Sequence, residues 1–252
     1  MLTKDTAICI RAIDYSETSQ ILTFFTRDTG KIGAIAKGSK RPKSSFGGPF
    51  EIFSYGKIVF AESNKDKLST LTEFEPSFRG AGFSALSANL FTLNCCLFGA
   101  ELLNKLTHDY DPHPQLFDDF LQFLKNSGES SNNFDMLTLL ILFQLSLLKE
   151  TGLQPVLSHC VNCKSRYASR DTKCEFYFSS SVNGLICRDC EAAFPDKIRL
   201  SPNTANCLSN LKLLAGAKEN TLKEIEKLLT YHLTETLGQK PKMAKYILST
   251  LT

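Results

Sequence analysis

Two pairs of cysteines constrain this chain more than any other feature of its sequence. Cys160 and Cys163 form one C-x-x-C pair, and Cys187 and Cys190 form a second pair further along. A tight turn in each pair directs both sulfur atoms toward one point, so two such pairs supply the four thiolates of a tetrahedral zinc site. The chain between them must then fold back on itself. A strand-like stretch, Glu175–Ser180, followed by an Asn-Gly turn predicts a hairpin there.

We expect this zinc to be structural rather than catalytic. A catalytic zinc keeps one coordination position for water, whereas four cysteines close the shell. Zinc deaminases combine an H-x-E sequence with P-C-x-x-C, and no histidine of this chain is followed two residues later by glutamate. His159 and Cys174 are spare ligand candidates. The other four cysteines lie in apolar segments and are expected to be small buried side chains: Cys9, Cys95, Cys96 and Cys207.

The sequence pattern of the first eighty residues predicts a small β-barrel. The expected strands are Thr6–Ala12, Gln20–Thr26, Lys31–Lys37, Phe50–Phe60 and Leu68–Glu75. Gly33, inside the third strand, indicates a bulge or tight curvature. Five short strands with an internal glycine are typical of an OB-fold, although an SH3-like barrel would have a similar pattern.

The pattern changes to helical spacing after Pro76. The expected helices are Phe83–Leu106, His113–Lys125, Phe134–Glu150, Thr204–Leu214 and Leu222–Leu237. Leu137–Leu148 is nearly all apolar but too short to span a membrane, which favours a central core helix. The predicted fold is therefore α+β. A five-stranded OB-fold β-barrel occupies residues 1–78, and an all-helical domain occupies 79–252 with a four-cysteine, zinc-finger-like zinc-binding insertion at 157–194.

Positive charge is concentrated between Thr29 and Phe50, where no acidic residue occurs. The formal net charge of the whole chain is only +3, so this local excess carries more information. Five candidate DNA-binding residues lie in the segment: Lys31, Lys37, Lys40, Arg41 and Lys43. Glycine, serine and proline around them predict a mobile, exposed loop beside the third strand, where its cations can follow a phosphate backbone. A solvated loop without a partner is the alternative.

Aromatic side chains in and beside this segment are candidates for stacking on bases. They are Phe24, Phe25, Phe46 and Phe50. Phe24 and Phe25 point to opposite faces of their strand, so at least one of them is expected in the core, and neither is assigned a stacking role.

Taken in order, these features resemble the RecO family over nearly the whole chain. The most specific passage, TGKIGAIAKGSKRPKSSFGG at residues 29–48, is similar to the third strand and basic loop of that family almost position by position. Supporting passages are Leu71–Glu75, Leu148–Cys163 and Tyr231–Leu251. The resemblance implies an OB domain, a helical domain and an embedded zinc site. It also implies binding to single- and double-stranded DNA, annealing of complementary strands, and assistance, with RecR, to RecA loading on strands coated by single-strand-binding protein.

The resemblance also assigns roles to individual residues. It gives DNA contact to Lys37, Lys40, Arg41 and Lys43, and zinc coordination to the four cysteines of the two pairs. The chain is expected to be cytoplasmic, because Met1–Ile10 lacks a signal-peptide pattern and no long apolar run occurs. The resemblance further implies that it is nucleoid-associated.

We expect a mediator rather than an enzyme, since no Walker loop, carboxylate cluster or Ser/His/Asp arrangement is present. Two alternatives stay open. The first is a zinc-dependent nucleic-acid enzyme, a nuclease or deaminase, and chelation separates it from a mediator. A structural site loses its fold with the zinc, whereas a catalytic site loses only turnover. The second is an RNA-binding OB protein, which competition between DNA and RNA strands of equal length would identify.

Overall fold

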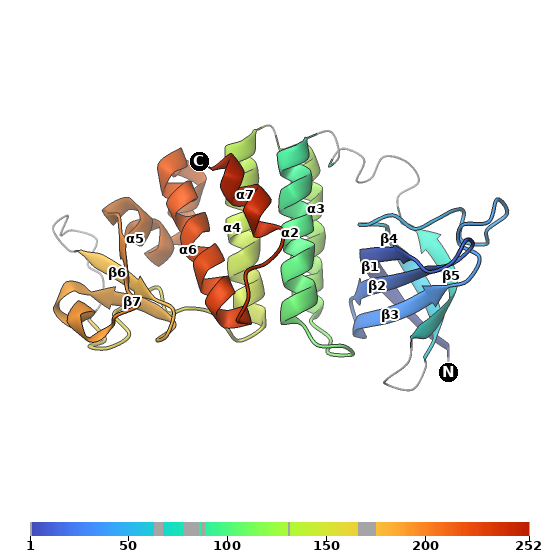
Figure 1. Cartoon of the computed structure of the whole chain (residues 1–252), viewed down its shortest axis with the longest axis horizontal. Helices are drawn as coiled ribbons and strands as arrows, with labels where there is room; N and C mark the ends of the chain where they lie inside the picture. Colours follow the sequence, from blue (N-terminus) through green and yellow to red (C-terminus); the bar gives the residue numbers. More distant parts are fainter. Residues whose placement is uncertain are drawn as a thin grey trace. The chain divides into compact units, whose positions relative to one another are not determined.

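The computed structural model describes residues 2–62, 68–77, 86, 89–130, 132–165 and 175–251. They belong to two compact units, unit 1 at residues 1–129 and unit 2 at residues 130–252, and each is described by itself (Figure 1). Within the described ranges, no helix has the length and apolar character needed to cross a bilayer. The domain limits of 1–78, 79–252 and 157–194 stay a prediction.

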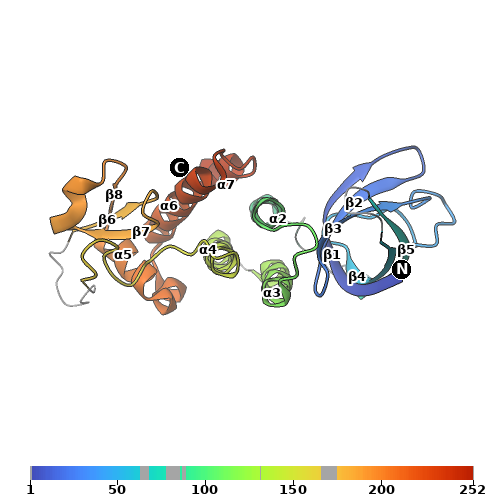
Figure 2. The same cartoon turned by 90° about the horizontal axis from the view of Figure 1, so that it is seen from below.

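Unit 1 begins with a closed barrel of five strands. They are β1 (Leu2–Asp14), β2 (Gln20–Thr26), β3 (Gly30–Ala36), β4 (Tyr55–Ala61) and β5 (Ser69–Pro76). The strand order is β1-β2-β3-β5-β4, and β4 closes the barrel by pairing with β1. Among these five strands, the β3–β5 pair is parallel and the other pairs are antiparallel. Figure 2 shows the strands enclosing one interior. The predicted five-stranded barrel of OB type is confirmed.

The length of β1 explains how only five strands form a closed barrel. Its first half pairs with β4 and its second half with β2, and a bulge between Cys9 and Arg11 bends the strand where the pairing changes. Alternate side chains such as Leu22, Phe24 and Ile32 fill the interior.

The fourth strand begins later than the sequence predicts, at Tyr55 rather than Phe50. Phe53 has a φ of 68°, which interrupts an extended chain. The backbone N–H and the carbonyl of Phe50 both form hydrogen bonds with the side chain of Gln20, so they do not pair with a neighbouring strand.

Two helices complete unit 1, α2 (Leu90–Leu106) and α3 (Pro114–Glu129). Asn89 caps α2 through hydrogen bonds from two backbone N–H groups of its first turn. Helix α3 packs its aromatic side chains on the outside of the barrel. The ring centroid of Phe117 lies 5.9 Å from that of Phe25, and the Phe120 centroid lies 6.4 Å from that of Phe53. The predicted helix start at Phe83 lies outside the described residues.

Unit 2 combines helices with a small sheet. The helices are α4 (Asn133–Glu150), α5 (Pro202–Ser209), α6 (Glu219–Leu237) and α7 (Ala244–Thr250), with 3-10 turns η1 (Arg188–Ala193) and η2 (Leu211–Gly216). The strands are β6 (Phe176–Ser179), β7 (Gly184–Cys187) and β8 (Ile198–Leu200), in the order β7-β6-β8. Helix α4 is buried on most sides, in agreement with its apolar sequence. The predicted helix Thr204–Leu214 is wrong as one element, because Asn210 ends α5 and its side chain caps η2.

The core between α4 and α6 contains a buried carboxyl group. Glu226 of α6 is fully buried, and its oxygens accept hydrogen bonds from Gln144 Nε2 at 2.9 and 3.0 Å and from Thr230 Oγ1 at 3.2 Å. Burial raises the pKa of Glu226 from 4.5 to about 8, against the opposite effect of these hydrogen bonds. The neutral acid is therefore the favoured form in this core at pH 7.

The substitution Glu226→Gln is expected to stabilise unit 2 at alkaline pH. Between pH 4.5 and about 8 the unfolded chain has released this proton while the folded chain keeps it. Stability therefore falls by about 1.4 kcal/mol per pH unit across the window and stays constant above it. A neutral amide removes this dependence. Urea unfolding at a series of pH values measures the free energy of unfolding of both proteins. If this free energy depended on pH in the variant as it does in the parent, the burial argument would be contradicted.

Candidate nucleic-acid interface and metal centre

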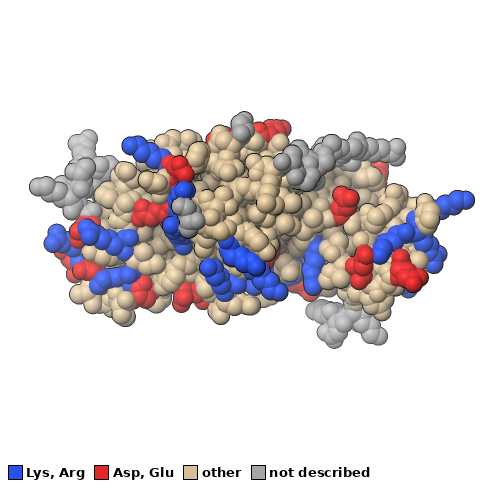
Figure 3. Space-filling model, turned by 45° about the horizontal axis from the view of Figure 1, so that its top comes forward, with Lys and Arg blue, Asp and Glu red and all other residues tan. Residues whose placement is uncertain are grey.

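The basic loop, defined as residues 37–49, connects β3 to the segment before β4. Three of its predicted DNA-binding side chains are exposed: Lys37, Arg41 and Lys43. Lys40 is half-buried, and its Nζ lies 2.5 Å from Asp14 Oδ2 at the end of β1. In Figure 3, Lys and Arg side chains project from the end of unit 1 that carries this loop. The structure thus presents three of the cations to solvent and pairs the fourth.

Hydrogen bonds fold the basic loop, although its composition predicts a mobile segment. Arg41 N–H donates to Gly38 O, Ser44 N–H to Arg41 O, and Gly47 N–H to Ser44 O. These are three successive turns, and the glycines at positions 38 and 47 have φ values of 75° and 80° that suit them. The cations are therefore held on a series of turns rather than on an open chain.

Gln20, a buried residue at the start of β2, fixes both ends of this loop. Its Oε1 accepts hydrogen bonds from Phe50 N–H at 2.8 Å and from Ser39 Oγ at 3.0 Å. Its Nε2 donates to the carbonyl of Phe50 at 3.2 Å. Sequence reasoning missed Gln20. The one signal that could have identified Gln20 is its polar side chain at the start of a mostly apolar strand.

The phenylalanines near the loop belong to the protein interior. Phe24, Phe25 and Phe50 are buried. Phe46 is half-buried, and its ring centroid lies 5.6 Å from that of Phe50. Phe24, Phe25 and Phe50 are not placed to stack on bases, and Phe46 packs against the barrel core.

The structure removes Lys31 from the group of cations that DNA could reach. Its side chain is 11% exposed, and Nζ lies 3.4 Å from Asp109 Oδ1. Nζ also donates hydrogen bonds to the carbonyl oxygens of Asn104 at 2.8 Å and Thr107 at 2.7 Å. These carbonyls end α2, where unpaired oxygens and the helix dipole favour a cation. The expectation that Lys31 contacts DNA is therefore corrected: it caps a helix.

Replacing Lys31 by Met is expected to destabilise unit 1 by about 2 kcal/mol, because two carbonyls lose a charged donor. DNA affinity measured well below the melting temperature should not change. Thermal unfolding and fluorescence anisotropy measure the two properties, and Lys37→Met is the matched control that should show the reverse pattern. A Lys31→Met variant that keeps its melting temperature and loses DNA affinity would restore Lys31 to the DNA surface.

The four predicted metal ligands come together in unit 2. The sulfur atoms of Cys160, Cys163, Cys187 and Cys190 all lie within 4.8 Å of one another. Cys163 Sγ and Cys187 Sγ are 3.7 Å apart, well beyond the ~2.05 Å of a disulfide bond. Four cysteines this close could hold one metal ion. The spare candidate His159 hydrogen-bonds to Ser158 and is not in the group, and Cys174 lies outside the described residues.

Local backbone structure positions each pair of cysteines. In the first pair, Lys164 N–H donates to Cys160 O, which closes the turn, and Lys164 has a φ of 62°. The second pair begins where β7 ends and continues into η1. Val161 N–H donates to Leu185 O, which holds the first turn against β7. Gly184 permits this approach, because a Cβ atom there would lie 2.5 Å from Cγ2 of Val161.

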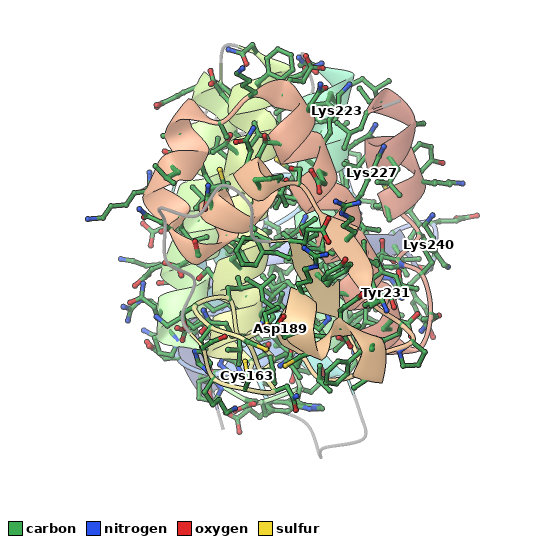
Figure 4. All side chains as sticks on the ribbon, turned by 90° about the vertical axis from the view of Figure 1, so that its left-hand side faces the viewer. Cys163, Asp189, Lys223, Lys227, Tyr231 and Lys240 are labelled. Atoms are coloured by element: carbon green, nitrogen blue, oxygen red, sulfur yellow. The ribbon has the colours of Figure 1, made fainter. Side chains whose placement is uncertain are left out.

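Hydrogen-bonding groups surround the sulfur atoms. Asn162 Nδ2 donates to Cys190 Sγ at 3.3 Å, and Cys187 N–H donates to Cys160 Sγ at 3.4 Å. Ser165 Oγ lies 3.0 Å from Cys163 Sγ, and this side-chain hydrogen bond is the main reason that the pKa of Cys163 is lowered to about 6. At Cys163 these donors favour the thiolate form that binds metals. Burial, followed by hydrogen bonds with Cys190 and Cys163, raises the pKa of Cys187 to about 12. Figure 4 shows Cys163 near Asp189 at the end of unit 2 away from Lys223.

The remaining cysteines behave differently. Cys9, Cys95, Cys96 and Cys207 are buried, as their apolar surroundings predict. Burial raises the pKa of Cys9 and of Cys96 to about 12. These four thiols lie outside the group of close cysteines.

Three described cations in the segment of the second cysteine pair and β8 form ion pairs with carboxylates. Arg188 and Arg199 both contact Glu175, and Lys197 lies 2.7 Å from Glu191.

Comparison with known proteins identifies the family. Residues 1–78 match the family model described as "Recombination protein O N terminal", and residues 87–245 match "Recombination protein O C terminal". A protein named "DNA repair protein RecO" from Bacillus subtilis (strain 168) is 33% identical over 256 residues, which cover 98% of this chain and 94% of the relative. A relative of the same name from Anaeromyxobacter dehalogenans (strain 2CP-C) is 28% identical over 251 residues, covering 97% and 95%. Because both family models match and the relatives align over nearly the whole chain, the chain belongs to the RecO family.

Proposed function

We propose that this chain is a DNA repair and recombination mediator that binds single- and double-stranded DNA and anneals complementary strands. One observation carries the proposal: an OB-type barrel presents Lys37, Arg41 and Lys43 to solvent on a hydrogen-bonded loop. The names of the relatives, which are DNA repair proteins, support the same conclusion. Family membership further supports partnership with RecR and assistance to RecA loading on strands coated by single-strand-binding protein.

The proposed mechanism needs no bond-making group. Cations that contact phosphates release counterions and weaken the repulsion between two strands. A protein that holds both strands also raises their effective concentration, and base pairing then supplies the driving force. Contacts to the phosphate backbone carry little sequence information, so binding should be broad and sensitive to salt.

We propose further that the four cysteines bind a structural zinc ion. In a regular tetrahedron with Zn–S bonds of about 2.3 Å, sulfur atoms are ~3.8 Å apart, and the measured Cys163–Cys187 separation is 3.7 Å. Four thiolates leave no open position for water or substrate. The zinc would join two knuckles and a small sheet of only three short strands, and would therefore contribute to folding rather than to chemistry.

Strand pairing tests the proposed function directly. The full chain is expected to accelerate pairing of complementary oligonucleotides, one with a fluorophore and one with a quencher, without nucleotide or added metal ions. The acceleration should diminish as salt rises. A pairing rate equal to that without protein would overturn annealing. Competition by an RNA strand of equal length separates a DNA mediator from an RNA-binding protein, since tighter RNA binding would favour the latter.

A further inference from the structure

One aromatic side chain of the barrel does face solvent. Tyr15, in the turn between β1 and β2, is 64% exposed. Among the described residues of the barrel, the other phenylalanine and tyrosine side chains are buried or half-buried. The turn is closed by a hydrogen bond from Tyr15 N–H to Ser19 O at 3.0 Å. An exposed, unpacked aromatic ring on an otherwise well-packed barrel is available to a ligand.

Hydrogen bonds join this turn to the basic loop. Lys40 N–H donates to Thr18 O at 3.1 Å, and Gly38 N–H donates to Ser19 Oγ at 3.2 Å. The Lys40 ammonium also reaches Asp14, the residue before Tyr15. The exposed ring and the exposed cations are therefore parts of one connected surface, made by two loops from the same end of the barrel.

The charge of this surface favours a polyanion. The turn and the end of β1 carry Asp14 and Glu17, whereas the basic loop carries four cations and no acidic residue. In OB-folds, the loop between the first two strands is one of the loops that bind oligonucleotides. Aromatic rings beside cationic grooves stack on unpaired bases, and the stacking tolerates any sequence because every base has a π-face.

We propose that Tyr15 stacks on an unpaired base of single-stranded DNA while the basic loop contacts its phosphates. This inference rests on the proposed function and adds a strand preference to it. Bases of a duplex are stacked on each other and cannot cover the ring, so Tyr15 strengthens binding to single strands alone. When a bound strand pairs with its complement, the contact to Tyr15 is lost. The residue thereby favours release of the annealed product.

A tryptophan at this position provides a direct probe, because the chain contains no tryptophan. In the full-length Tyr15→Trp variant, oligo-dT is expected to quench the indole emission, and a blunt-ended duplex that binds is expected to leave it unchanged. Tyr246→Trp is the matched control, since Tyr246 is also exposed but lies on α7 of unit 2. Emission of Tyr15→Trp that does not change while anisotropy shows bound oligo-dT would overturn the proposal.

Affinities provide the second measurement. Tyr15→Ala is expected to weaken binding of oligo-dT by about 5- to 100-fold and to leave duplex affinity within about twofold. Tyr15→Phe should keep the parent affinity, because the ring is retained. Ile13→Ala, which shortens a neighbouring side chain that is 40% exposed, is the control for lost apolar surface. Equal losses for oligo-dT and duplex, or none for either, would refute stacking by Tyr15. If the parent chain bound neither probe, the proposed function itself would be wrong.

Discussion

Cys187→Ala is expected to abolish binding of the proposed zinc and to unfold the segment that contains β6, β7 and β8. Structural zinc contributes about 10–16 kcal/mol of apparent binding free energy in small peptides at pH 7, more than the stability of most domains. Cys187 is also where β7 meets the metal ligands, so its loss separates the sheet from the first knuckle. We expect no comparable effect in unit 1, which contains none of the four ligands.

Two measurements and one control variant test this prediction. Zinc released from the purified protein gives the metal content, and hydrogen exchange of the amides in residues 176–200 reports the fold of the segment. Cys207→Ala is the matched control, because Cys207 is a buried thiol of unit 2 outside the ligand group. A Cys187→Ala protein that kept its zinc, or that lost zinc without faster exchange in residues 176–200, would contradict a structural metal.

The triple substitution of Lys37, Arg41 and Lys43 by Ala is expected to weaken binding to DNA of every sequence. In a plot of log affinity against log salt concentration, each lost phosphate contact makes the slope shallower by about 0.7 for a single strand and 0.9 for a duplex. Three lost contacts therefore change the slope by about 2 and 2.7. The turns of the loop depend on backbone groups and on Gln20, so the variant should stay folded.

The control for this variant must remove the same charge elsewhere. Lys57, Lys149 and Lys212 are exposed and lie outside the basic loop, so their triple substitution by Ala lowers the net charge equally. Anisotropy titrations at several salt concentrations compare the two proteins. Equal slopes for both variants would mean that general charge, and not the loop, binds the DNA.

The group of four close cysteines and the barrel could be predicted because short-range patterns specify them. Two C-x-x-C pairs determine the geometry of their own turns, and the alternation in β2 determines which side chains enter the barrel, so Gln20–Thr26 was predicted to the residue. The three-residue strand β8 was missed, because its extended form depends on pairing with β6 rather than on its own sequence. Helix α7 was missed for a related reason, since it is short and begins without a side-chain cap.

Lys31 shows why sequence alone could not separate the cations. It lies in the same acid-free segment as Lys37 and Lys43, and nothing local distinguishes it. Its partners are carbonyls near the end of α2, more than seventy positions away along the chain. Tyr15 could not be singled out from the sequence either. What distinguishes it from Phe24, Phe25 and Phe50 is its exposure, which depends on how the barrel packs.

The packing of α3 on the barrel determines where unit 1 can be divided. A fragment that ended at residue 78 would lack the rings of Phe117 and Phe120 that cover Phe25 and Phe53. It would also lack the carbonyls that hold the Lys31 ammonium. Bare aromatic rings favour aggregation over folding. An isolated DNA-binding fragment of this protein should therefore extend to residue 129, where the barrel still carries its own helical cover.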